Sequence, residues 1–107
     1  MRKVLSVLIL AMIVGALGTA ATAGETVKVS GSTTVLPLAE GGAEAFNSAQ
    51  ANYKVIVTGG GTGVGIKNVA DGISDIGMAS REVTADEISQ FGDKFNENLI
   101  GYDGIVI

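Results

Sequence analysis

The turn that follows the first short apolar run of this chain restricts the possible folds more than any other feature. In residues 29–37, small and hydroxyl-bearing side chains separate a β-branched run from a proline that suits the first turn of a helix. Such a turn lets backbone N–H groups converge, and the helix that follows adds a partial positive charge. Similar glycine- and hydroxyl-rich turns follow at residues 58–65 and 78–84. Three turns of this kind predict an anion-binding site.

Short β-branched runs alternate with segments of helical periodicity along the rest of the chain. Strands are expected at 26–30, 53–58, 74–79 and 99–107, and helices are expected to begin at Pro37, after Gly65 and at Thr84. The last helix opens with the capping-box sequence Thr84-Ala85-Asp86-Glu87. Strands that alternate with helices require crossover connections. The sequence therefore predicts an α/β fold with a mainly parallel sheet flanked by helices.

Helical spacing also predicts which residues face the sheet. The apolar face of the first helix comprises Leu38, Gly42, Ala45 and Phe46, and the second helix is expected to bury Ile66, Val69, Ala70 and Ile73. Gly41 and Gly42 weaken the first helix by about 1 kcal/mol each relative to alanine. We expect these two glycines to allow close packing against the sheet.

The glycine-rich second turn does not match the known nucleotide-binding loops. A dinucleotide fingerprint needs glycines at positions i, i+2 and i+5, but Gly59 and Gly61 are followed by Val64 at the third position. A Walker A loop needs lysine straight after its last glycine, whereas an isoleucine follows Gly65. Two interpretations remain: a structural turn with positive φ angles, or an anion contacted by backbone N–H groups and by Thr62.

The third turn carries an arginine directly after a strand. Arg81 stands next to Ser80, and an arginine so placed can make a bidentate contact to an oxyanion. The alternative is a surface arginine paired with Glu82 or Asp86. Lys67, one turn into the second helix, is expected to be a solvated surface charge.

The N-terminal residues have the three-part pattern of a secretory signal peptide. Residues 1–3 are a basic start, residues 4–17 are an apolar run, and residues 18–23 are small and end in Ala-Thr-Ala. We expect cleavage between Ala23 and Gly24. The apolar run is short for a membrane span, which needs roughly 20 residues, although extending it to Ala23 would reach that length. An uncleaved membrane anchor is therefore the alternative.

Composition excludes several classes of function. Removal of residues 1–23 leaves five basic residues against eleven acidic ones, a net charge of −6. An acidic exported domain does not fit a nucleic-acid binder, whose affinity depends on a basic surface. The chain has no cysteine and no histidine. It therefore lacks a disulfide framework, the usual neutral-pH general base and the commonest transition-metal ligand.

Three motifs together resemble those of extracytoplasmic phosphate-binding proteins, the substrate-binding components of phosphate ABC transporters. They are Ser30-Gly31-Ser32-Thr33-Thr34, Gly60-Gly61-Thr62-Gly63 and Asp75-Ile76-Gly77-Met78-Ala79-Ser80-Arg81, in this order. The resemblance implies a two-lobed Venus flytrap of the type II-like periplasmic-binding-protein fold, with phosphate held between the lobes. Residues 24–107 correspond to the N-terminal lobe, and the second lobe is absent. Because the chain stops inside an apolar run, we expect a truncated lobe.

The resemblance assigns seven candidate ligand-binding residues to the three turns. Ser32, Thr33 and Thr34 match the first turn, Thr62 and Gly63 the second, and Ser80 and Arg81 the third. The best-known branch of the family has an aspartate where this chain has Ser80. That carboxylate accepts the proton of hydrogen phosphate and rejects sulfate, so its replacement leaves the preference for phosphate over sulfate open. Many relatives carry a Ser-Arg pair at this turn.

The function implied is capture of inorganic phosphate for delivery to the membrane permease of an ABC importer, with no cofactor or metal. The complete protein is expected to be a monomer. The alternatives are a binder of molybdate, tungstate or sulfate, and a non-functional exported fragment. An enzyme that acts on phosphorylated substrates is least consistent with the sequence. The only carboxylates near the glycine turns, Asp71 and Asp75, flank the start of the third predicted strand, away from the ligand side.

Overall fold

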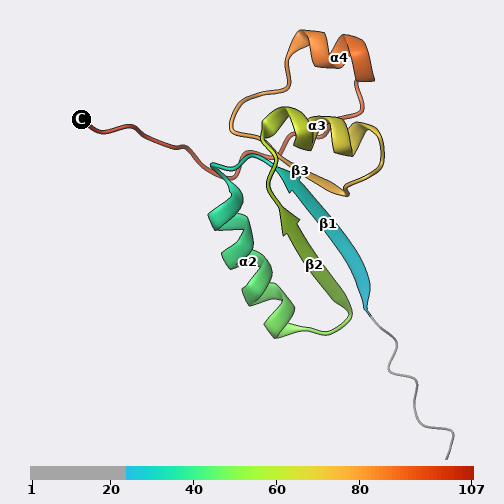
Figure 1. Cartoon of the computed structure of the whole chain (residues 1–107), viewed down its shortest axis with the longest axis vertical. Helices are drawn as coiled ribbons and strands as arrows, with labels where there is room; N and C mark the ends of the chain where they lie inside the picture. The colour runs from blue at the N-terminus through green and yellow to red at the C-terminus, as the bar shows by residue number, and fades with distance from the viewer. Residues whose placement is uncertain (1–23) are drawn as a thin grey trace, which may run out of the picture.

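The computed structural model describes residues 24–107, which form a small α/β unit (Figure 1). In chain order its elements are β1 (Glu25–Gly31), α2 (Leu36–Ala49), β2 (Tyr53–Thr58), α3 (Thr62–Ala70), β3 (Ile76–Met78) and α4 (Ala85–Phe91). The predicted signal peptide lies outside the described residues. Within this part of the chain, none of the helices has the length and apolar character that a membrane crossing needs.

The strands form one parallel sheet in the order β2-β1-β3. Glu25 of β1 is in register with Tyr53 of β2, and Val29 is in register with Ile76 of β3. The predicted α/β fold with a parallel sheet is confirmed. Because all three strands run in the same direction, the turns that follow them lie at the same end of the sheet.

The core lies close to this end of the sheet. Its buried apolar side chains are Val29 on β1, Ile66 on α3 and Met78 on β3. Helix α3 packs across β1 and β3, whereas α2 runs alongside β2 (Figure 1). The best-packed part of the described chain is therefore the part that supports the turns.

A small polar cluster lies between the sheet and α3. The buried hydroxyls of Ser30 and Ser74 are 2.7 Å apart, and the side-chain amide of Asn68 donates to Ser30 Oγ at 3.1 Å. Burial of a hydroxyl is costly unless it is hydrogen-bonded. These three side chains satisfy one another, so they fix α3 over the end of β1.

The end of β1 and the first turn of α3 are in backbone contact. A Cβ placed on Gly65 would lie 2.7 Å from both the Cα of Gly31 and the carbonyl oxygen of Ser30, and 2.9 Å from the carbonyl oxygen of Met78. Gly31 also has a φ of 138°, a conformation that other residues rarely adopt. Both positions require glycine, because any side chain would push α3 away from the strand ends.

Two side-chain amides of α2 bind the outer edge of β2. Asn47 Nδ2 donates to the carbonyl of Val55 at 2.9 Å, and Asn47 Oδ1 accepts from the N–H of Val55 at 2.8 Å. Gln50 binds the N–H and the carbonyl of Tyr53 in the same way, each at 2.9 Å. The two amides occupy backbone groups that an additional strand would otherwise pair with. Helix α2 thus covers this edge of the sheet.

Two predictions about helix α2 are wrong: its buried apolar face and its close packing against the sheet at Gly41 and Gly42. Helix α2 buries no residue, and Leu38 and Phe46 of its predicted core face are 67% and 45% exposed. Because α2 is anchored at the strand edge by its amides, a Cβ on Gly41 or Gly42 would meet nothing within 4 Å, and the expected close packing is absent.

The last residue of the predicted core face of α3 is also exposed. Ile73 is 56% exposed, because α3 ends at Ala70 and a turn through Gly72 follows. The third predicted strand is present, but it spans only Ile76–Met78.

The predicted fourth strand at residues 99–107 is not formed. This segment has no regular secondary structure, and Ile105, Val106 and Ile107 are fully exposed. An apolar, β-branched composition favours a strand only where a neighbouring strand takes up its N–H and carbonyl groups. No described strand pairs with this segment.

Two glycine-to-alanine variants test the backbone contact. We expect Gly65→Ala to lower the free energy of unfolding by about 2 kcal/mol or more, because the new methyl group overlaps backbone atoms that cannot rotate away. Gly41→Ala is the matched control. It places the same methyl group in open space on a helix and should raise the free energy of unfolding by about 0.5–1 kcal/mol. Urea denaturation measures both, and equal effects would contradict the close contact.

Candidate anion-binding site

Backbone hydrogen bonds tie the three predicted turns together. The N–H of Ser32 in the first turn donates to the carbonyl of Met78 at the start of the third, at 2.9 Å. The N–H of Gly61 in the second turn donates to the carbonyl of Gly31 in the first, also at 2.9 Å. Residues from three separate parts of the sequence therefore form one surface at the carboxyl ends of the strands.

In the first turn, the buried Ser32 is followed by two exposed threonines, Thr33 and Thr34. Ser32 is 2% exposed, and its Oγ accepts a long hydrogen bond of 3.4 Å from the N–H of Val35. Ser32 thus shapes the turn that leads into α2. Thr33 and Thr34 are exposed, and neither hydroxyl has a partner among residues 24–107. These two side chains are available to a ligand.

The second turn opens onto the uncapped N-terminus of α3. Its N-cap residue is Gly61, which has no side chain to accept a hydrogen bond, and its first turn carries no acidic residue. The first intrahelical bond runs from the N–H of Gly65 to the carbonyl of Gly61. The N–H groups of Thr62, Gly63 and Val64 therefore have no partner within the helix, and they lie at its positive end.

Helix α4 gives an internal contrast. Its N-terminus is closed by the predicted capping box, in which Thr84 Oγ1 accepts from the N–H of Glu87 and the Glu87 carboxylate accepts from the N–H of Thr84. The side chains of α4 thus cap its N-terminal backbone N–H groups, whereas no side chain caps those of α3.

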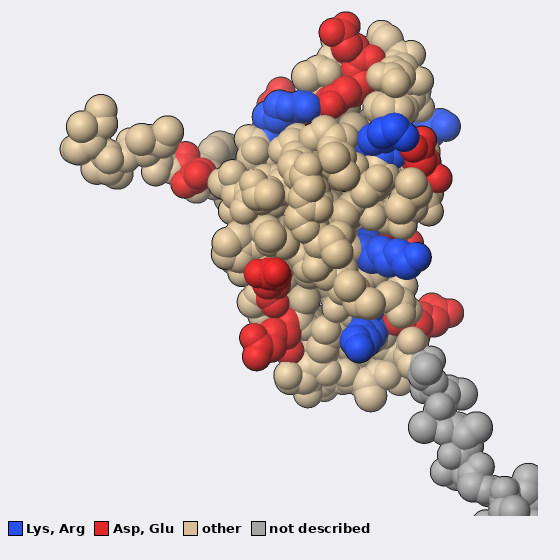
Figure 2. Space-filling view, viewed as in Figure 1, with Lys and Arg blue, Asp and Glu red and all other residues tan. Residues whose placement is uncertain are grey.

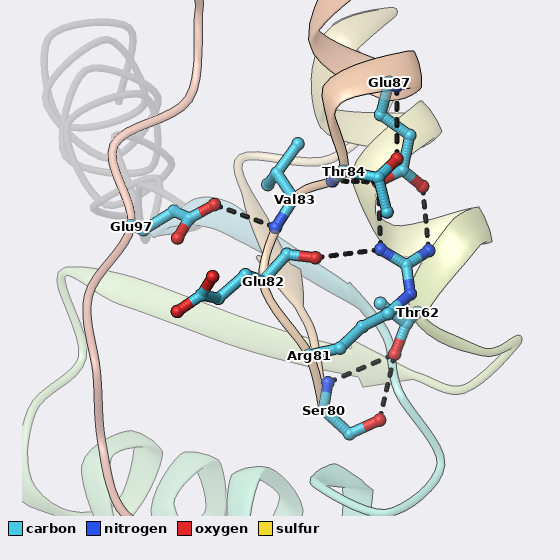
Figure 3. A network of polar contacts seen from close by, with 8 residues as sticks. All are labelled: Thr62, Ser80, Arg81, Glu82, Val83, Thr84, Glu87 and Glu97. Carbon is cyan, nitrogen blue, oxygen red and sulfur yellow. Dashed lines mark hydrogen bonds and ion pairs between the residues drawn. The ribbon is translucent and has the colours of Figure 1, made fainter.

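The second and third turns meet through two side chains that the sequence assigned to the site. Thr62 Oγ1 accepts from the N–H of Ser80 at 3.1 Å and lies 3.2 Å from Ser80 Oγ (Figure 3). The next residue, Arg81, extends from the same turn. Thr62 and Ser80, which are 18 positions apart in sequence, are thus brought together as predicted, and Arg81 follows directly after Ser80.

Arg81 makes an ion pair that sequence reasoning missed. Its Nη1 and Nη2 atoms donate to the two carboxylate oxygens of Glu87 at 2.9 and 2.8 Å, and Nη1 also donates to the carbonyl of Glu82 at 2.9 Å (Figure 3). The alternative interpretation named Glu82 or Asp86 as the carboxylate partner, and neither side chain takes that role. The signal was present in the capping box, which already places Glu87 at the start of α4.

Glu87 is ionised well below the usual pH range for a carboxyl group. The hydrogen bonds from Arg81 and then from the N–H of Thr84 lower the pKa of Glu87 to about 2. The hydrogen bonds to Glu87 in turn raise the pKa of Arg81 above its ordinary value. Both groups are therefore charged at neutral pH.

Lys67 and Asp75, two other charged residues considered in the sequence, lie away from the three turns. Lys67 is 61% exposed and pairs with Asp71 one helical turn further on, as expected for a surface charge. Asp75 accepts from the backbone N–H of Lys28 at 2.8 Å at the start of β3. On the face shown in Figure 2, basic side chains do not merge into one patch. Residues 24–107 contain no cluster of acidic, histidine or cysteine residues that could hold a metal ion.

A pH titration tests the Arg81–Glu87 pair. Because the folded-state pKa of Glu87 lies below its ordinary value of 4.5, ionised Glu87 favours the folded state. Its stabilisation is complete above about pH 4.5 and is lost as the pH falls towards 2. Carbon-detected NMR of the Glu87 carboxyl should show a midpoint of about 2. Arg81→Gln should raise that midpoint towards the ordinary value but not fully to it, because the hydrogen bonds from Thr84 remain. A wild-type midpoint near 4 would contradict the pair.

Comparison with known proteins places this geometry in a family. Residues 18–107 match the PBP superfamily domain. The chain is 37% identical over 79 residues to phosphate-binding protein PstS 2 of Streptococcus pneumoniae, an alignment that covers 74% of this chain and 26% of that protein. It is 33% identical over 84 residues to protein SphX of Synechococcus elongatus, with 76% and 25% covered. The chain therefore spans about a quarter of the length of these relatives.

A solved structure shows the same local fold. A phosphate ABC transporter substrate-binding protein from Clostridium perfringens, determined with bound phosphate, superposes with a TM-score of 0.56 and 40% sequence identity, covering 64% of this chain and 28% of that one. The similarity extends from the overall sequence to the arrangement of strands and helices. The chain belongs to the PBP superfamily and is homologous to the phosphate-binding protein PstS.

Proposed function

We propose that residues 24–107 form the N-terminal lobe of an extracytoplasmic protein that captures inorganic phosphate for an ABC importer. The observation that carries the proposal is the union of the three turns around the uncapped N-terminus of α3, with Thr62, Ser80 and Arg81 beside it. The relatives named as phosphate-binding proteins, and the related structure with bound phosphate, support the choice of ligand.

The acidic charge of the lobe means that phosphate must be held by directed short-range bonds. Residues 24–107 carry a net charge of −6, so their overall field does not attract an anion. Hydroxyl and backbone donors at the turns act only within hydrogen-bond distance and favour a ligand whose oxygens match their positions. The proposed contacts come from Ser32, Thr33, Thr34, Thr62, Gly63, Ser80 and Arg81.

These residues have different roles in the proposal. The exposed hydroxyls of Thr33 and Thr34 donate from one side, and the free N–H groups of Thr62 and Gly63 donate from the end of α3. Ser80 offers its hydroxyl, and Arg81 adds the fixed positive charge. Ser32, which is buried, contributes mainly by holding the turn in shape.

The complete protein is proposed to be a two-lobed monomer that closes on its ligand and docks on a membrane permease. The described chain spans about a quarter of its relatives' length, so the second wall of the site would come from a further lobe. Binding, and not catalysis, is the proposed activity. Asp71 and Asp75, the carboxylates considered for acid–base chemistry, are engaged by Lys67 and by the Lys28 backbone.

Ser80 keeps a second oxyanion possible. A serine hydroxyl can donate to a fully deprotonated anion such as sulfate, molybdate or tungstate, and it can also accept the proton of hydrogen phosphate. An aspartate at this position would accept only. A competition titration tests the choice of ligand: phosphate, sulfate, molybdate and tungstate are compared by the amide NMR shifts that each produces at the three turns.

A phosphate titration followed by amide NMR tests the site. One lobe leaves its donors hydrated, so we expect saturation with a Kd of the order of 1 mM or weaker, with shifts concentrated at Thr33, Gly63 and Ser80. Shifts confined to other residues would contradict the site. Saturation below the micromolar range would contradict the single-walled geometry.

Single substitutions test the roles. In the complete protein, Arg81→Ala should weaken phosphate binding most, by about 1.5–3 kcal/mol, because it removes a charged donor. Thr33→Ala and Ser80→Ala should each cost about 1–2 kcal/mol as single neutral donors. Lys67→Ala is the control, since it removes the same charge from a surface pair on α3. If Arg81→Ala and Lys67→Ala have equal effects, Arg81 does not contact the anion.

Export is also proposed from the N-terminal sequence. Residues 1–23 have the order of a signal peptide, so the exported protein should begin at Gly24 and reside in the periplasm or another extracytoplasmic compartment. N-terminal sequencing of exported material tests this expectation. Recovery of Met1 in a membrane fraction would instead support an uncleaved anchor.

A further inference from the structure

The hydrogen bonds of Arg81 divide its guanidinium into an occupied side and an open side. A guanidinium has five N–H donors. Glu87 takes one from Nη1 and one from Nη2, and the carbonyl of Glu82 takes the second from Nη1. Within residues 24–107, the Nε–H group and one Nη2–H group have no partner. These two donors are parallel and adjacent, which is the fork that binds an oxyanion through two oxygens.

Glu87 is itself held in place. Its carboxylate accepts from the N–H and the hydroxyl of Thr84, and its own N–H donates to Thr84 Oγ1. Its side chain is only 16% exposed, whereas that of Arg81 is 44% exposed. The carboxylate is therefore tethered to the first turn of α4, and Arg81 is the more exposed partner.

We propose that Glu87 is a positioning residue that orients Arg81 so that its open fork receives a tetrahedral oxyanion at the Thr62–Ser80 turn. This inference rests on the proposed function and deepens it. Figure 3 shows the guanidinium between Glu87 on one side and the Thr62–Ser80 pair on the other. Because the arginine is ordered before the ligand arrives, less of its side-chain freedom is lost on binding.

An opposing effect makes the proposal testable. The negative charge of Glu87 repels an anion and offsets the charge of Arg81. If Glu87 only neutralised Arg81, its removal would strengthen anion binding. If Glu87 positions Arg81, its removal weakens binding even though the site loses a negative charge.

The test is the variant Glu87→Gln in residues 24–107, titrated with inorganic phosphate and followed by amide NMR. Glutamine at this position can still complete a capping box, so α4 should keep its N-terminus while the charged pair is lost. Phosphate affinity should fall about three- to tenfold, which corresponds to ordering one flexible side chain. Asp86→Asn is the matched control. It removes the same charge from the same helical turn without touching Arg81, so affinity should stay constant or rise.

A second readout separates this inference from the proposed function. The Nη–H signals of Arg81, whose groups donate to Glu87, should be resolved in the wild type and lose intensity through faster solvent exchange in Glu87→Gln. The Nε–H signal should shift when phosphate is added to the wild type. Constant or higher phosphate affinity in Glu87→Gln would overturn the positioning role alone. An equal loss in Asp86→Asn would overturn it as well. A wild type that shows no phosphate-dependent shift at any of the three turns would overturn the proposed function.

Discussion

The close approach of Gly31 and Gly65 is the constraint on which the rest of the described structure depends. It places the first turn of α3 directly against the end of β1, and the carbonyl of Met78 lies against the same two glycines. No side-chain interface could hold three backbone segments this close. Once they are in contact, the hydrogen bonds from Ser32 to Met78 and from Gly61 to Gly31 follow from the same geometry. The site is thus built from backbone first and from side chains second.

This construction suits the binding of a small anion that we propose for this acidic part of the chain. Backbone N–H groups cannot be neutralised by pairing with a mobile side chain, and their directions are fixed by the fold. The open N-terminus of α3 keeps such donors free, while the capping box of α4 satisfies its own. Selectivity in a site of this kind depends more on where the donors point than on net positive charge.

Local signals in the sequence predicted those parts of the fold that local interactions determine. The strand at Tyr53–Thr58 and the capping box at Thr84 were correctly predicted, because β-branched composition and cap chemistry act within a few residues. The convergence of Thr62 and Ser80 was also predicted, since parallel strands bring their carboxyl ends together.

The errors concern partners that are distant in sequence. Helical periodicity assigned Leu38 and Phe46 to a core face, but the amides of Asn47 and Gln50 dock α2 on the strand edge instead. The apolar segment at residues 99–107 has the composition of a strand and no described neighbour to pair with. Its residues alone could not reveal that lack of a partner.

The pairing of Arg81 with Glu87 shows why charge alone is a poor guide to this site. An isolated arginine would attract anions more strongly, but it would sample many rotamers and would present any of its five donors. Pairing with Glu87 offsets part of the attraction between Arg81 and an anion, and it leaves one pair of guanidinium donors, Nε–H and Nη2–H, with a defined orientation. Because Thr62 and Ser80 are fixed to each other beside it, the directions of hydroxyl and guanidinium donors are set before a ligand arrives. In the proposed site, an anion must match this geometry, and a charge of the correct sign is not sufficient.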